Sequence, residues 1–233
     1  MNQSVAIILA RGGSKRIPRK NIRVFRGQPI IYYPVRAAIE SGCFDEVMVS
    51  TDDDEIAAVA REAGAVTPFR RSREMANDHA TSTDAFIEVI EQYRALNRPF
   101  KYLCGLYAAA PLVRPNHLRA GKSLLDSDEK IQTVMPVTRF GYPIQRAFSI
   151  KDDKLILMHP ENAFTRSQDL PAAYHDAGQW YWLRTEALLA SRKIFSSFCV
   201  PLVLSELEAQ DIDNEEDWRL AELKAELFES KSE

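Results

Sequence analysis

The residues with the clearest chemical potential lie in one short segment, Leu9 to Asn21, near the amino terminus. This segment carries the groups that a chain of phosphates requires: Arg11, Gly12, Gly13, Ser14, Lys15, Lys20 and Asn21. The glycines lack side chains, so a phosphate could approach their backbone N–H groups closely, and the serine adds a hydroxyl donor. One guanidinium and two ammonium groups can neutralise a triphosphate, which a glycine-rich loop alone cannot do. The segment therefore predicts an anion-binding loop.

The distribution of charge supports a localised anion site. The first 39 residues contain eight Lys or Arg and no Asp or Glu, whereas the whole chain has a net charge of −3. A cationic segment ahead of an acidic body does not favour a nucleic-acid partner, which would need basic residues over a wider face. The Gly and Lys positions do not match a Walker A loop, and no third Gly completes a dinucleotide-binding fingerprint. A solvated basic loop remains the alternative interpretation.

Two late carboxylates could hold a metal ion. Asp211 and Asp213 are separated by a single residue, so in an extended segment both side chains point to the same face. Mg²⁺ prefers one or two carboxylates together with phosphate oxygens of a substrate, and this pair would suit it. The alternative is a capping box, because Asp213 and Glu216 have the required spacing. The run Asp52 to Glu55, where a predicted strand meets a helix, is interpreted as a helix cap.

The elements that position these groups follow from hydrophobic patterning. The chain has 233 residues, of which 45% are hydrophobic and 27% charged, and this suits a single globular domain spanning residues 1–233. Apolar runs predict strands at residues 4–10, 46–50, 102–108, 132–137, 180–183 and 200–204. Helical spacing predicts helices at residues 29–41, 54–63, 83–96, 115–125, 186–191 and 215–228.

Strands that alternate with helices predict an α/β fold, a three-layer α/β/α sandwich with a mostly parallel sheet. The ligand crevice of such a sheet opens beyond the carboxyl ends of its strands, and the basic segment follows the first of them. Residues 138–177 break the alternation, because they hold Pro143, Pro160 and Pro171 and two short alternating stretches. This region predicts a small hairpin-bearing insert, a subdomain of its own.

The sequence gives no sign of a membrane or disulfide-stabilised protein. Its longest apolar runs fall far short of the roughly 20 residues that span a bilayer, and Arg11 ends the first run too early for a signal peptide. The three cysteines, Cys43, Cys104 and Cys199, are widely spaced, so neither a disulfide framework nor a zinc site is predicted. We expect a cytoplasmic protein without a membrane partner.

The segment Leu9 to Asn21 resembles the opening motif of the CMP-nonulosonate synthetases, the acylneuraminate cytidylyltransferases that activate sialic-acid-like nine-carbon sugars. Further stretches agree in order, so that the resemblance runs from residue 5 to about 222: Ser50–Asp53, Arg71–Ser82, Ala110–Leu112 and Gln210–Asp217. The segments that most resemble the members acting on pseudaminic acid are Lys15–Asn21, Pro143–Ala147, Arg166–Leu170 and Tyr174–Trp182. Arg16 and Tyr107 depart from the pattern of the sialic acid enzymes, which puts N-acetylneuraminic acid in doubt as the sugar.

The resemblance implies a fold like that of the nucleotide-diphospho-sugar transferases and a reaction of CTP with pseudaminic acid to give CMP-pseudaminic acid and pyrophosphate. Lys20, Asp211 and Arg11 would be the catalytic residues, acting through position and charge. Asp211 and Asp213 would hold Mg²⁺. The resemblance also places Arg71 and Ser82 beside the nucleotide, although Arg71 could be a solvated charge and Ser82 part of a helix start.

Candidate sugar-binding residues gather in or beside the insert, where they combine cations, amides and ring donors: Gln145, Arg146, Arg166, Gln168, Tyr174 and His175. A guanidinium matches a carboxylate in a bidentate way, so Arg166 or Arg146 is expected to bind the carboxylate of the nonulosonic acid. Each of these residues could equally be a surface or interface group. The resemblance implies a homodimer in which each insert reaches toward the partner's cleft.

Other functions remain open at this stage. The same reaction could use legionaminic or N-acetylneuraminic acid. A glycosyltransferase on a similar sheet would bind a nucleotide sugar without releasing pyrophosphate, and a non-catalytic module would bind CTP without turnover.

Overall fold

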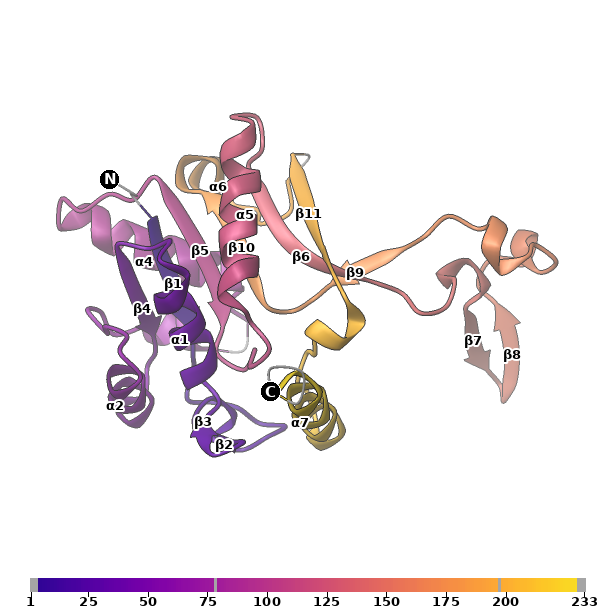
Figure 1. The fold of residues 1–233 in the computed structure, drawn as a ribbon, viewed down its shortest axis with the longest axis horizontal. Helices are drawn as coiled ribbons and strands as arrows, with labels where there is room; N and C mark the ends of the chain where they lie inside the picture. The colour runs from indigo at the N-terminus through magenta and orange to yellow at the C-terminus, as the bar shows by residue number, and fades with distance from the viewer. Residues whose placement is uncertain (1–3, 78, 197, 230–233) are drawn as a thin grey trace.

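A computed structural model describes residues 4–77, 79–196 and 198–229 of the chain. Its centre is a seven-stranded sheet in the order β11-β6-β10-β5-β1-β4, with β9 paired to β6 (Figure 1). The strands are β1 (Ser4–Leu9), β4 (Glu46–Ser50), β5 (Tyr102–Tyr107), β6 (Thr133–Arg139), β9 (Tyr174–Asp176), β10 (Trp180–Arg184) and β11 (Cys199–Leu204). β1 pairs in parallel with β4 and β5, and β11 with β6, whereas β10 and β9 are antiparallel to their neighbours. The expected mostly parallel sheet is confirmed.

Helices cover both faces of this sheet. The helices that do so are α1 (Tyr32–Ser41), α2 (Asp54–Glu62), α4 (Ser82–Ala95), α5 (Pro115–Ser127) and α6 (Thr185–Ser191). The described residues also form the short α3 (Arg73–Ala76) and the carboxyl-terminal α7 (Glu215–Glu229). The side chains of β1 alternate between two separate cores: Ala6 and Ile8 pack with α1, α2 and α5, while Val5 and Ile7 pack with α4 and α6. This alternation makes β1 apolar throughout, because a strand buried on both faces has no solvent side. The three-layer sandwich is therefore confirmed.

The helix expected at 29–41 begins later than its pattern suggested. Arg26 and Gly27 have positive φ angles of 44° and 89°, and they form the turn between β2 (Val24–Phe25) and β3 (Gln28–Pro29). Only after this hairpin does α1 begin, at Tyr32. The other predicted boundaries lie within a few residues of the observed ones. The short α3 and β9 were not predicted.

The predicted insert is an arm that leaves the sheet from β6 and returns through β9 (Figure 1). Its outer part is the antiparallel hairpin of β7 (Phe148–Lys151) and β8 (Lys154–Leu157). Asp152 and Asp153 adopt positive φ angles of 51° and 56°, which suit a tight two-residue hairpin turn. Most side chains of the hairpin are exposed.

A third core joins the two ends of the chain. Ile17, Phe25 and Ile30 from the amino-terminal region pack with Ile212 and with Trp218 of α7. This packing brings the segment before α7 next to the basic loop that follows β1. No helix among the described ranges is long and apolar enough to cross a membrane.

Candidate active site

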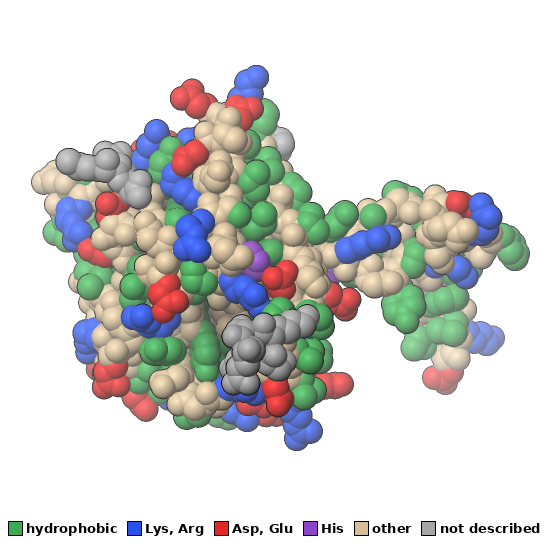
Figure 2. Space-filling view, in the orientation of Figure 1, with side chains coloured by type: hydrophobic (Ala, Val, Ile, Leu, Met, Phe, Trp, Pro, Cys, Tyr) green, Lys and Arg blue, Asp and Glu red, His purple; other side chains and the backbone are tan. Residues whose placement is uncertain are grey.

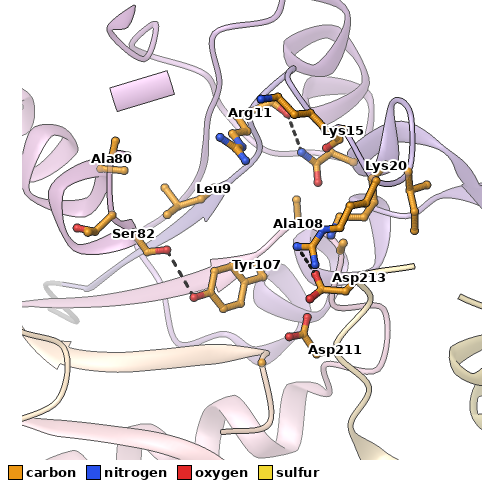
Figure 3. A pocket seen from close by; sticks show the side chains of 18 of the residues that line it. Leu9, Arg11, Lys15, Lys20, Ala80, Ser82, Tyr107, Ala108, Asp211 and Asp213 are labelled. Atoms are coloured by element: carbon orange, nitrogen blue, oxygen red, sulfur yellow. Dashed lines mark hydrogen bonds and ion pairs between the residues drawn. The ribbon is translucent and has the colours of Figure 1, made fainter. Parts of the chain in front are cut away.

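A cleft of about 720 Å³ opens beyond the carboxyl ends of β1 and β5 (Figure 3). Its walls come from the loop after β1, from residues 71–85, from the end of β5 and from residues 176–213. Nine of the predicted nucleotide-binding and metal-binding residues line it: Arg11, Ser14, Lys15, Lys20, Asn21, Arg71, Ser82, Asp211 and Asp213. The fold thus brings together cations and carboxylates that are about 190 residues apart in sequence.

Lys20 connects the two charged parts of the cleft. It opens a single 3₁₀ turn, Lys20–Ile22, and its Nζ donates to the carbonyl oxygen of Ile212 at 2.6 Å. Burial lowers the pKa of Lys20, and the nearby carboxylates of Asp213 and Asp211 oppose that shift. Lys20 is consequently held against the segment that carries the carboxylate pair.

The two carboxylates both face the cleft because the residue between them is an anchor. The side chain of Ile212 is buried in the third core, so Asp211 and Asp213 are presented on the other face of an extended segment. Burial raises the pKa of Asp211, and the charge of Asp213 raises it further. Asp213 also pairs with Arg16, with 2.7 Å between Oδ1 and Nη2.

The capping-box interpretation of Asp213 is wrong. The Oδ1 atom of Asn214 accepts hydrogen bonds from the backbone N–H groups of Glu216 and Asp217 at 2.8 and 3.0 Å. The Asp217 carboxylate in turn accepts from the backbone N–H of Asp213 at 2.9 Å. Because Asn214 and Asp217 cap α7, the Asp213 side chain is left to the cleft. Asp211 and Asp213 form the oxygen-rich, incomplete ligand set that a divalent cation shares with substrate phosphates.

The structure corrects the role expected for the two glycines of the loop. Neither Gly12 nor Gly13 lines the cleft, and the backbone N–H of Gly12 donates to Oδ1 of Asp52 at 2.9 Å. A Cβ atom on Gly12 would lie 2.9 Å from Oδ2 of Asp53. Gly12 is therefore needed for the close approach of the loop to the end of β4, and its N–H already has an acceptor.

Further hydrogen bonds hold the loop in place. Asn21 donates from Nδ2 to the carbonyl oxygen of Arg11 at 2.9 Å. Asp53 caps α2, as predicted, by accepting from the backbone N–H groups of Glu55 and Ile56. It also accepts from Arg19 at 2.5 and 3.2 Å, and this hydrogen bond is the main cause that lowers the pKa of Asp53.

Arg71 and Ser82 occupy the opposite wall. Arg71 is not a solvated charge: its Nε and Nη2 donate to the hydroxyl and carbonyl oxygens of Ser50 at 3.0 and 2.8 Å. Burial lowers the pKa of Arg71 to about 10, so the guanidinium stays protonated at neutral pH. Thr81, rather than Ser82, caps α4 through a capping box with Asp84. The Ser82 hydroxyl is thereby left on the wall of the cleft.

The sequence did not point to the polar row that completes this wall. The hydroxyl of Tyr107 lies 3.5 Å from that of Ser82 and 3.5 Å from that of Tyr181, and Tyr181 donates to the carboxylate of Asp176. Burial raises the pKa of Tyr181, with further contributions from Tyr107 and Asp176, so this phenol keeps its proton at neutral pH. In the sequence, Tyr107 stood out only as a departure from the sialic acid enzymes, and its position at the carboxyl end of a central strand was the further signal for a place in the cleft.

The candidate sugar-binding residues do not reach this cleft within one chain. None of them is among its lining residues: Gln145, Arg146, Arg166, Gln168, Tyr174 and His175. Arg166 pairs with Asp169 of the arm at 2.8 Å, and a ring nitrogen of His175 lies 2.9 Å from the hydroxyl of Thr138. Tyr174 and His175 lie in β9 beside β6, whereas the other candidates belong to the arm, which extends away from the body of the molecule (Figure 1).

A three-layer α/β sheet that carries a cationic loop and a carboxylate pair in one cleft has the arrangement that a nucleotidyltransferase requires. The model of the Cytidylyltransferase family matches residues 5–229, and the chain belongs to this family. It is 41% identical, over 95% of both chains, to the pseudaminic acid cytidylyltransferase of Campylobacter jejuni subsp. jejuni serotype O:23/36 (strain 81-176).

Two further similarities extend this result. The chain is 30% identical, over 96% of both chains, to the CMP-N,N'-diacetyllegionaminic acid synthase of Legionella pneumophila subsp. pneumophila (strain Philadelphia 1). The solved structure of a CMP:2-keto-3-deoxy-manno-octonic acid synthetase complexed with CTP shares the fold, with a TM-score of 0.69 at 16% identity over 97% of this chain and 99% of that one.

Proposed function

We propose that this cytidylyltransferase joins CTP to pseudaminic acid, forming CMP-pseudaminic acid and pyrophosphate. The observation that carries the substrate assignment is the 41% identity over 95% of both chains to a pseudaminic acid cytidylyltransferase. Identity to the legionaminic acid enzyme over a similar length is 30%. The cleft supports the nucleotide half of the proposal, since its cations suit a triphosphate.

In this reaction the anomeric hydroxyl of the sugar acid would attack the α-phosphate of CTP. Arg11, Lys15 and Lys20 would balance the phosphate charge, and Ser14 would donate its hydroxyl to a phosphate oxygen. Because Lys20 is fixed by the Ile212 carbonyl, its ammonium needs little reorganisation to face developing charge. Arg71, buried at the end of β4, would add a second fixed cation on the opposite wall.

Cytidylyltransferases generally depend on a divalent metal ion, and Asp211 and Asp213 are the residues that would hold it. We assign Mg²⁺ because its preference for carboxylate and phosphate oxygens fits this pair. When bound, the ion would neutralise phosphate charge and favour ionisation of a nearby sugar hydroxyl. The chain itself contributes the fixed separation of the two carboxylates, which depends on the buried Ile212 between them.

The arm supports a homodimer as the working form. Its large apolar side chains are among the most exposed of the described residues, with 76% for Ile150, 67% for Leu155 and 100% for Phe164. Figure 2 shows such side chains gathered around the hairpin. Exposed apolar surface of this kind marks an interaction site. A second copy would cover it, and Arg146 or Arg166 would then lie near the partner's cleft to meet the sugar carboxylate.

A screen for pyrophosphate release tests the proposal. CTP, ATP, GTP and UTP are each combined with pseudaminic, legionaminic and N-acetylneuraminic acids in the presence of Mg²⁺. We expect release with CTP and pseudaminic acid at a kcat/KM well above every other pair. Faster release with legionaminic acid would overturn the sugar assignment. Binding of CTP without release with any sugar acid would favour a non-catalytic module, and use of a preformed nucleotide sugar would favour a glycosyltransferase.

The metal assignment is tested by Asp211→Asn. We expect kcat to fall roughly 100-fold or more at saturating Mg²⁺, because the variant loses one of the two anionic ligands. Asp126→Asn serves as the control, since Asp126 lies on α5 and pairs with Lys122 outside the cleft. Thermal unfolding of both variants verifies the fold. A normal rate in Asp211→Asn would reject this carboxylate as a metal ligand.

A further inference from the structure

Four hydroxyl and carboxylate groups form a row along one wall of the cleft, and each comes from a different element. Ser82 opens α4, Tyr107 ends β5, Tyr181 lies in β10 and Asp176 ends β9. Figure 3 shows Ser82 and Tyr107 pointing toward each other, on the side of the cleft away from Lys15 and Lys20. All four residues of the row line the cleft, and the charge arguments above assign a function only to Ser82 among them.

Asp176 determines which hydroxyl of the row donates a hydrogen bond and which accepts one. Oδ1 of Asp176 accepts from the backbone N–H of Gly178 at 2.8 Å, and the other oxygen accepts from the Tyr181 hydroxyl. A carboxylate only accepts, so Tyr181 donates its single proton to Asp176. The contact in which Tyr181 could instead donate to the Tyr107 hydroxyl is long, at 3.5 Å, so the proton goes to Asp176. The phenol oxygen of Tyr181 is then left with lone pairs on the side that faces Tyr107.

The remaining hydroxyls of the row are incompletely paired with one another. The distances of 3.5 Å from Tyr107 to Ser82 and to Tyr181 exceed the roughly 2.5–3.0 Å of a well-formed O–H···O hydrogen bond. A ligand group can therefore hydrogen-bond to Tyr107 and Tyr181 without displacing a strong interaction. The acceptor lone pairs of Tyr181 suit an N–H or O–H donor.

The charge of the cleft decides which part of a sugar acid lies along this row. Asp176 lies close enough to Asp211 for its charge to contribute to the raised pKa of that carboxyl, so this side of the cleft carries negative charge. A phosphate or sugar carboxylate would be repelled by the Asp176 carboxylate and attracted to Lys20 and Arg11. Neutral donors of the sugar, its amide N–H and hydroxyl groups, have no such penalty.

We propose that Asp176 is a positioning residue for the sugar: by accepting the proton of Tyr181, it makes the pair Tyr107 and Tyr181 an acceptor surface for the acylamido N–H and hydroxyl groups of the nonulosonic acid. This inference rests on the proposed function, and it assigns the recognition of neutral sugar substituents to residues of the same chain. Asp176 acts through Tyr181 and does not itself touch the substrate.

Steady-state kinetics with the full-length protein tests this role. Asp176→Asn, Tyr181→Phe and the double variant are assayed for pyrophosphate release while CTP and pseudaminic acid are varied separately. Asparagine keeps the shape of Asp176 but can donate to Tyr181, so the fixed direction is lost. We expect the KM for the sugar acid to rise roughly tenfold in each single variant and the KM for CTP to stay within about twofold of the wild-type value.

The double variant separates positioning from a general structural effect. If Asp176 acts only through Tyr181, the double variant should match Tyr181→Phe, because the two changes remove one interaction. Multiplied effects on the sugar KM, or an equal loss for CTP and sugar, would overturn the inference. Thermal unfolding reports the fold, with Asp126→Asn as a matched control. If Asp176→Asn does not fold, Tyr107→Phe and Tyr181→Phe still test the acceptor surface.

A sugar analogue adds a readout that loss of stability would not move. The analogue carries a hydrogen atom in place of an acylamido group that faces the row. Wild-type enzyme should have a higher KM for this analogue than for pseudaminic acid, and Tyr181→Phe should abolish most of this difference in KM. Equal discrimination in both proteins, tested across each acylamido position, would contradict the proposal. Failure of the proposed function would look different: wild-type enzyme would release no pyrophosphate with any acylamido nonulosonic acid.

Discussion

Lys20 shows how a single residue ties the nucleotide side of the cleft to the metal side. Its ammonium reaches the Ile212 carbonyl at 2.6 Å, between two carboxylates, and burial lowers its pKa while those carboxylates oppose the shift. A lysine in solvent would lose side-chain entropy on binding a phosphate, whereas one that is already fixed loses less. The cost of ordering this cation is therefore met during folding.

Removal of this cation should impair the use of CTP. We expect Lys20→Met to lower kcat/KM for CTP by roughly 100-fold, because methionine keeps most of the apolar stem but leaves the triphosphate short of one fixed charge. Pyrophosphate release at varied CTP concentration measures the effect. Lys130→Met, at an exposed lysine outside the cleft, is the control. An unchanged kcat/KM in Lys20→Met would contradict a role for this ammonium at the phosphates.

Asp53 supports the basic loop through a charge whose effect depends on pH. Its pKa is lowered chiefly by the hydrogen bond from Arg19, so the ionised carboxylate stabilises the fold at pH values above its unfolded pKa of about 3.9. This stabilisation is lost as the pH falls through the lower, folded-state pKa.

We expect Asp53→Asn to lower the free energy of unfolding by ~1 kcal/mol at neutral pH, because asparagine still caps α2 but cannot pair with Arg19. The difference from the wild-type protein should shrink below about pH 4, where the carboxylate of the unfolded chain begins to be protonated while the native one is still ionised. Urea unfolding at a series of pH values measures both effects. A difference that stays constant down to the acid transition would show that the charge of Asp53 is not the cause.

At the scale of elements, the sequence predicts strands that are buried on both faces far better than it predicts their direction. Residues 4–9 form a continuous apolar run because both faces of β1 are covered. β10 is equally apolar, but its antiparallel direction depends on the path of the arm that precedes it, and no local pattern encodes that path. The hairpin β2–β3 was missed because strands of two residues have no periodicity.

The same limit explains which site residues could be predicted. The cations of the basic loop lie within one short segment of the sequence and were identified together, and the same holds for the pair Asp211 and Asp213. Asp176, Tyr181 and Tyr107 come from three strands, and each resembles an ordinary strand residue by itself. Only the antiparallel entry of β10 between β5 and β6 brings their hydroxyl and carboxylate groups into one row.

Packing of α5 on the sheet depends on a glycine. A Cβ atom at Gly121 would lie 2.5 Å from the ring of Trp180, and Trp180 is fully buried. We expect Gly121→Ala to lower the free energy of unfolding by about 1–3 kcal/mol, despite the better helix propensity of alanine. Gly13→Ala is the matched control, since its Cβ would meet nothing within 4 Å. Equal urea midpoints for the two variants would show that α5 shifts without cost.

At the scale of the whole molecule, the arm divides the chain into a body with a nearly complete nucleotide cleft and an extension whose apolar residues have nothing to cover them among the described residues. Within the described part of the chain, β7 and β8 pair only with each other, and a two-stranded hairpin is marginally stable in water without further packing. A second copy of the chain would supply that packing and would also place the cations of the arm near a cleft.

This arrangement predicts that assembly and sugar use fail together. We expect sedimentation to show a dimer for the wild-type protein and a monomer for the double variant Ile150→Asp and Leu155→Asp. The side chains of Ile150 and Leu155 are 76% and 67% exposed, so two charges at these positions would have to be buried in the interface. The KM for the sugar acid should rise, while CTP binding should persist because its cleft lies within one chain. Leu96→Asp, at a 55% exposed position on the body, should remain dimeric. A wild-type monomer with full activity would remove the need for a partner.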